Sequence, residues 1–201
     1  MTRNLTEKEK KALEKALRLA ARNGDTNQIR ALLKRGVDIN AVHEESGQTA
    51  LMYAAANGNK EAVELLLKNG ANINQDDKKG YSALAWAVAN GKTDMVNLLI
   101  ARGADVNAKT PTNHRILDIV RHKLKNASHR EAPEYRKIEQ ALMNAGAKTR
   151  DEASKGFLSG TLLGRWLGLD GDENNQAQNI TEEKSAQARP ANYNQANRGR
   201  G

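Results

Sequence analysis

Residues 51–74 read LMYAAANGNKEAVELLLKNGANIN, and closely similar stretches lie on both sides of them. Residues 17–40 read LRLAARNGDTNQIRALLKRGVDIN, and residues 84–107 read LAWAVANGKTDMVNLLIARGADVN. The shared glycines are 34 and then 33 residues apart, at positions 24, 58 and 91 and again at 36, 70 and 103. A fixed period of this length indicates a repeat architecture.

Each unit is predicted to form two short helices joined by a tight turn. Leu51, Ala54 and Ala55 recur at helical spacing, and Asn57 followed by Gly58 ends that helix, because both residue types tolerate left-handed backbone. A second, leucine-rich helix follows and ends at another Asn-Gly pair. One such pair of helices cannot bury its own apolar face, so we expect the pairs to stack into a solenoid.

The units resemble ankyrin repeats, whose first helix opens with the pattern T-P-L-H-x-A. At the corresponding positions, residues 49–54 read TALMYA and residues 82–87 read SALAWA, with Ala in place of the usual Pro and Met or Ala in place of the usual His. The resemblance covers residues 7–148. It implies an all-α ankyrin-repeat solenoid of about four repeats, in which helix-turn-helix units are joined by hairpin-like loops.

The repeat boundaries divide the chain into six segments. The first unit opens with a capping-box pattern at Thr6 and Glu9. The fourth unit carries about ten extra residues near 123–135, where Pro133 prevents one uninterrupted helix. We expect an N-terminal capping repeat at 6–40, repeats at 41–74 and 75–107, a degenerate C-terminal repeat with an insertion at 108–148, a Gly-striped apolar segment at 149–170 and a disordered tail at 171–201.

Neither the composition nor the motifs favour an enzyme. The chain has no cysteine, aromatic residues make up 3% of it, and no phosphate-binding loop, zinc-protease motif or nucleophile elbow occurs. We therefore expect no catalytic residues, no cofactor and no metal site. Asp76 and Asp77 are adjacent carboxylates, but in ankyrin repeats an Asp at the place of Asp77 closes the hairpin turn, which is the role that we expect here.

The compartment and the oligomeric state are predicted more indirectly. The N-terminus lacks the apolar core of a secretory signal, and no apolar run approaches the roughly 20 residues that span a bilayer. We expect a cytoplasmic monomer. The Asn-rich, Glu-containing tail also resembles those of ankyrin proteins that intracellular bacteria deliver into host cells, which is the alternative location.

The resemblance implies a protein partner, held at the hairpin tips and on the exposed side of each first helix. Tyr81 is the preferred contact because exposed tyrosines are enriched among interface hot spots, although it could instead pack along its own hairpin. Leu19, Tyr53, Trp86 and Ile119 share one repeat position and are expected in the core between repeats. The predicted contact residues are Arg22, Asn23, Glu45, Ser46, Gln48, Asn57, Lys78, Lys79, Tyr81, Asn90, Pro111, Thr112 and His114.

Two features allow other functions. The net charge of +8 is densest over residues 110–150, which carry nine basic and four acidic side chains and suggest either a face for nucleic acid or a solvated cap. Residues 156–169 place a glycine at every fourth position beside apolar residues; they could cap the fourth repeat, dock on a partner or contact a membrane surface. The basic residues in question are Arg115, Arg121, Lys123, Lys125, Arg130, Arg136 and Lys137.

Overall fold

The computed structural model describes residues 6–110 and 113–149. Within these residues the chain forms helices and no strand, apart from one isolated bridge between Lys109 and Arg115. The all-α expectation is confirmed. In chain order the helices are α1 (Glu7–Asn23), α2 (Thr26–Lys34), α3 (Ala50–Asn57), α4 (Lys60–Lys68), α5 (Ala83–Ala89), α6 (Thr93–Ala101), α7 (Ile116–Asn126) and α8 (Ala132–Asn144).

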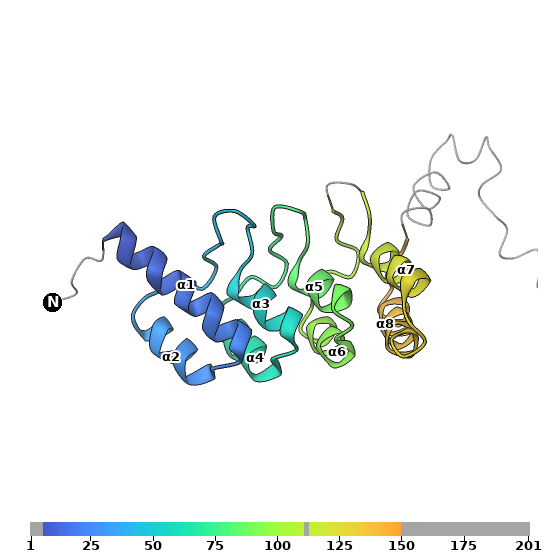
Figure 1. Ribbon diagram of the computed structural model, residues 1–201, viewed down its shortest axis with the longest axis horizontal. Helices are drawn as coiled ribbons and strands as arrows, with labels where there is room; N and C mark the ends of the chain where they lie inside the picture. Colours follow the sequence, from blue (N-terminus) through green and yellow to red (C-terminus); the bar gives the residue numbers. More distant parts are fainter. Residues whose placement is uncertain (1–5, 111–112, 150–201) are drawn as a thin grey trace, which may run out of the picture. The chain divides into compact units, whose positions relative to one another are not determined.

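The helices are arranged as four antiparallel pairs in two rows (Figure 1). The first helices of the pairs form one row, in which α1 packs on α3, α3 on α5 and α5 on α7. In the second row α2 contacts α4, and α6 contacts α8. Three long loops project from one side of the stack and join each pair to the next (Figure 1). This is the repeat solenoid that the period predicts.

Small side chains allow the first-row helices to approach closely. Ala54, Ala55 and Ala87 are completely buried between neighbouring helices. Leucines at one repeat position, among them Leu51 and Leu84, are 2% and 0% exposed and continue the same core from unit to unit. Burying apolar surface stabilises a protein by about 25 cal/mol per Å², which explains why units that are unstable alone become stable when they are stacked.

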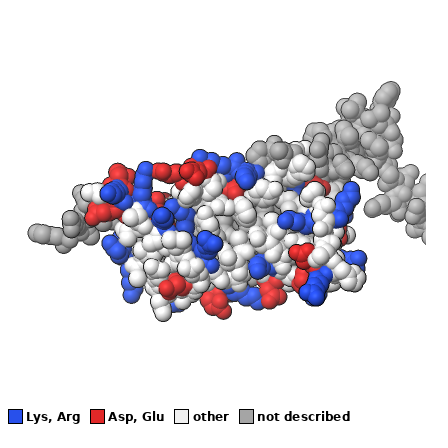
Figure 2. Space-filling model, viewed as in Figure 1, with Lys and Arg blue, Asp and Glu red and all other residues white. Residues whose placement is uncertain are grey.

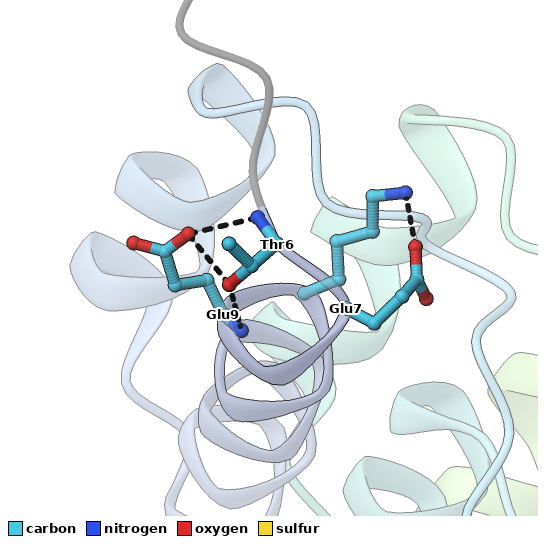
Figure 3. A network of polar contacts seen from close by, with 4 residues as sticks. Thr6, Glu7 and Glu9 are labelled. Atoms are coloured by element: carbon cyan, nitrogen blue, oxygen red, sulfur yellow. Dashed lines mark hydrogen bonds and ion pairs between the residues drawn. The ribbon is translucent and has the colours of Figure 1, made fainter.

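The first helix begins at the predicted capping box (Figure 3). The backbone N–H of Thr6 donates to Oε2 of Glu9 over 2.8 Å, and the N–H of Glu9 donates to Oγ1 of Thr6 over 3.3 Å. An ion pair of 2.7 Å between Lys10 and Glu7 lies beside it. The cap satisfies backbone donors that the first turn of a helix leaves without partners.

The fourth unit accommodates its extra residues by lengthening both helices. Helix α7 has 11 residues and α8 has 13, against seven in α5 and nine in α6. Pro133 lies in the first turn of α8, where a missing N–H is tolerated, so the predicted break in this insertion is confirmed. The hydroxyl of Tyr135 donates to the carbonyl of Ala89 over 3.3 Å and joins α8 to the third unit.

One prediction about the core is wrong for Leu19, which is 45% exposed. Tyr53, Trp86 and Ile119 at the same repeat position are half-buried, and Trp86 and Ile119 pack against the core as predicted. Other residues of each first helix supply its fully buried stripe, so this position falls on the edge of the helix face. Part of each of these side chains therefore remains accessible at the surface of the stack.

Several predicted features lie outside the described residues: the Gly-striped segment, the tail, Pro111 and Thr112. Over 6–110 and 113–149, no helix is long and apolar enough to cross a membrane.

Candidate partner-binding groove

A cavity of about 970 Å³ opens between the third and fourth units. The loop between α4 and α5, which we call the third hairpin because it opens the third unit, contributes Lys79 and Tyr81 to its wall. Helix α5 contributes Trp86 and Ala89. The remaining wall comes from the fourth unit. We call this cavity the groove; its fourth-unit residues are His114, Asp118, Ile119, Arg121, His122, Lys123 and Lys125.

Two aromatic rings form the apolar side of the groove. The ring centroids of Tyr81 and Trp86 are 5.8 Å apart and their planes are inclined by 50°, a tilted aromatic contact. Both side chains are half-buried, so part of each ring remains accessible. Tyr81 therefore packs against Trp86 and also lines the groove, and its role as a partner contact stays a prediction.

Asp77 fixes the two rings in place. Its Oδ1 accepts the backbone N–H groups of Lys79 and Tyr81 over 2.8 and 2.9 Å, and its Oδ2 accepts the indole N–H of Trp86 over 3.1 Å. The residue is 8% exposed. The predicted role of Asp77 in closing the hairpin is confirmed, and its carboxylate also orients a side chain of the next helix.

Asp76, by contrast, is exposed and makes no hydrogen bond with another residue in the described part of the chain. Its pKa is raised above the ordinary aspartate value, first by partial burial and then by the nearby charges of Asp77 and Asp105. The two adjacent carboxylates thus differ in role: Asp77 is held by three donors, whereas Asp76 experiences repulsion.

The opposite side of the groove is basic. On this side the groove is lined by Arg121, Lys123 and Lys125, and Lys79 adds a fourth basic residue from the third unit. Among the described lining residues, Asp118 supplies the one carboxylate. The guanidinium of Arg121 pairs with Glu139 over 2.9 Å. Asp118 accepts the backbone N–H of Arg115 over 2.9 Å and so caps α7. Three lysines, Lys79, Lys123 and Lys125, are left as the main source of positive potential at the rim.

The seven basic residues singled out in the fourth unit do not form one face. Arg121, Lys123 and Lys125 line the groove, whereas Lys137 borders a separate cleft between α6 and α8. Lys137 is paired there with Glu134 over 2.7 Å, and Arg115 donates to the carbonyl of Asn107 over 2.9 Å. The basic residues that line clefts are therefore divided between the groove and the α6–α8 side, and the suggested face for nucleic acid stays a prediction.

At the hairpin tips, the predicted contact residues differ in their freedom. Glu45 is exposed, while Ser46 and Gln48 are half-buried and hydrogen-bond to each other over 3.3 Å. Lys78 donates from its side chain to the carbonyl of Glu44 and from its backbone to that of Ser46, so it ties two hairpins together. Acidic and basic side chains lie close together along this edge, at the top of Figure 2.

The predicted residues at the helix ends are exposed, but two of them are used internally. The side-chain amide of Asn57 donates to the carbonyl of Tyr53 over 2.8 Å, and that of Asn90 donates to the carbonyl of Trp86 over 2.8 Å. Arg22 and Asn23 are exposed at the end of α1. Of the predicted contacts that lie within the described residues, Lys79, Tyr81 and His114 come together in the groove.

Trp86 and Ile119 are groove residues that the sequence interpretation assigned elsewhere. The sequence of α5 gives no clear signal for Trp86, because residues 83–89 are all apolar and Ala83, Leu84, Ala85, Ala87 and Val88 are buried. Only the packing of the helix places the indole at the groove.

The described ranges contain no group of three or more His, Asp or Glu residues that could hold a metal ion. The lining of the groove is mostly aromatic, aliphatic and basic, with one carboxylate, that of Asp118, among the described residues. The arrangement is suited to holding a ligand through contact area and charge.

Comparisons with known proteins agree with this geometry. Residues 17–110 match the family model for ankyrin repeats in three copies. A comparison with curated protein sequences finds no match. The matched residues run from Leu17 in α1 through α6 and into the loop before α7. By its repeats, its paired helices and this match, the chain is an ankyrin-repeat protein.

Proposed function

We propose that this protein is a scaffold or adaptor that holds a protein partner in the groove and at the adjoining hairpin tips. Ankyrin repeats are in general protein-interaction modules without catalytic activity. The observation that carries the proposal is the tilted pair of Tyr81 and Trp86, whose partly accessible rings line a cavity of about 970 Å³. Aromatic anchors of this kind dominate the binding energy of many interfaces.

Nucleic acid is the weaker alternative for the same surface. Recognition of single strands relies on aromatic rings that stack on successive bases. The two rings of the groove, Tyr81 and Trp86, already pack on each other at a tilt of 50°, and Tyr135, the one aromatic residue of the fourth unit, is only 8% exposed. The basic residues are also divided between the groove and the α6–α8 side. Both observations favour a protein partner.

Affinity capture with the full chain tests the proposal. The bait is compared with a Lys79→Ala/Tyr81→Ala variant, since these two side chains line the groove whereas Lys78 holds the hairpins together. A Lys34→Ala/Lys68→Ala variant is the control, because both lysines are exposed in the last turns of α2 and α4. All three baits are used with nuclease present, and the wild-type bait is also used without it.

The expected result is a protein that the wild-type and control baits retain and the groove variant loses. Equal retention by all three baits contradicts the groove as the binding surface, provided that circular dichroism shows the variants folded. Loss of binding on nuclease treatment alone would instead support the nucleic-acid alternative.

A further inference from the structure

We propose that the segment held in the groove is an acidic stretch of a protein, in which carboxylates flank one or two large apolar side chains. This inference rests on the proposed function and specifies the chemistry of the partner. It follows from the way in which apolar and basic groups are divided between the two sides of one cavity.

The third-unit side of the groove is suited to an apolar side chain. Trp86 is pinned by its hydrogen bond to Asp77 and by contact with Tyr81, so its accessible surface is preorganised. Ala89, one helical turn further along α5, leaves space beside the indole. An apolar side chain that enters here gains contact area without ordering a flexible wall.

The fourth-unit side is suited to carboxylates. Lys123 and Lys125 lie in the last turn of α7, and Lys79 faces them from the third hairpin. Among the described residues, none of these three lysines is within ion-pair distance of a carboxylate. Arg121, by comparison, has Glu139 as an internal partner. The lysines can therefore pair with a ligand without breaking an existing ion pair.

The same arrangement disfavours a polyphosphate. Phosphates repeat evenly along a strand, whereas the groove places its lysines at the rim and has Ile119, Ala89 and the carboxylate of Asp118 in its lining. A peptide can alternate apolar and acidic groups to match both sides, and a nucleic-acid backbone cannot.

The indole N–H signal of Trp86 provides a site-specific test. The chain contains two tryptophans, so a Trp166→Phe substitution identifies the Trp86 signal in a two-dimensional NMR spectrum of the full chain. The probes are a short peptide in which glutamates flank a pair of leucines, the same peptide with glutamine for every glutamate, the same peptide with alanine for both leucines, and a single-stranded oligonucleotide of equal length.

We expect the glutamate–leucine peptide to move the Trp86 signal to saturation, and each of the two altered peptides to bind at least about tenfold more weakly. Substituting Lys123→Ala and Lys125→Ala together lowers the affinity about three- to tenfold, whereas Lys34→Ala with Lys68→Ala leaves it within twofold. Rising salt concentration weakens binding in the wild type more than in the α7 variant.

Three outcomes overturn the inference: equal binding of the glutamine peptide, tighter binding of the oligonucleotide, or no effect of the α7 substitutions. If the glutamate–leucine peptide fails to bind or to displace a protein that the groove captures, the acidic class is wrong while the proposed function stands. If no protein is captured through the groove, the proposed function itself fails.

Discussion

Replacing Asp77 by alanine should destabilise the third hairpin and release the two groove aromatics. The carboxylate accepts three hydrogen bonds, from the backbone of Lys79 and Tyr81 and from the indole of Trp86. Lys79 is exposed, so water can replace the carboxylate there. The bonds to Tyr81 and Trp86 each contribute about 1–1.5 kcal/mol, which gives an expected loss of about 2–3 kcal/mol in the free energy of unfolding.

The conservative variant Asp77→Asn separates these contacts. Its side-chain oxygen can still accept the two backbone N–H groups, but its amide nitrogen then faces the indole N–H of Trp86, donor against donor. We expect a loss of about 1–2 kcal/mol, smaller than for alanine. The accessible surface of Trp86 should change in both variants, because the same bond orients its ring.

Urea denaturation followed by far-ultraviolet circular dichroism measures the free energies, and tryptophan fluorescence in a Trp166→Phe background follows the ring of Trp86. Asp76→Ala is the matched control, since Asp76 is the adjacent, exposed carboxylate. A loss below about 0.5 kcal/mol for Asp77→Ala, or one equal to that of the control, would refute the assigned role of the three hydrogen bonds.

Three further perturbations test the rest of the structure. Leu66→Ala removes a side chain that is 0% exposed and should cost about 2–5 kcal/mol, while the half-buried Leu67→Ala in the same helix should cost clearly less in the same urea titration; equal losses would contradict the packing of α4. Asp76→Asn should raise the melting temperature at neutral pH, because the raised pKa of Asp76 means that folding disfavours its ionised carboxylate. This gain should decline as the pH falls through the raised pKa and disappear at lower pH, where the wild-type side chain is protonated in both the folded and the unfolded state. Gly36 and Gly47 share the same left-handed backbone, with φ of 77° and 75°, so replacing either by alanine should cost about 1 kcal/mol in stability. The new methyl group at residue 47 would also lie 2.7 Å from the backbone nitrogen of Lys78, so thermal melts should show the larger loss of stability for Gly47→Ala.

Much of the fold could be predicted because each local feature had a local cause. The glycines that end the first helices, such as Gly24 and Gly58, adopt φ of 75° and 79°, and the spacing of these residues alone marks the unit length. The capping box at Thr6 and the interruption at Pro133 likewise depend on neighbours a few residues away. Because the period repeats along the chain, each unit leaves an apolar face that the next unit covers, and the units therefore stack.

The candidate site was predicted less completely. Lys79, Tyr81 and His114, which were predicted as partner contacts, line the groove, whereas Trp86 and Ile119 were assigned to the core because of the repeat position that they share. Their exposure is determined by the rotation of α5 and α7 about their own axes, which the smaller residues of the buried stripe fix. Size and polarity carry no information about that rotation, and because every residue of α5 is apolar, helical phase does not reveal it there either.

The sequence by itself therefore determined the repeat, its paired helices and the residues that end them, because backbone preferences and apolar periodicity act over a few residues. Tertiary structure alone decided which side chains share the groove and which charges are neutralised. Lys78 bonds to the preceding hairpin while Lys79 lines the groove. Arg121 pairs with Glu139, whereas Lys123 and Lys125 are not within ion-pair distance of any carboxylate in the described part of the chain. These outcomes depend on distances between separate units, which only the packed stack establishes.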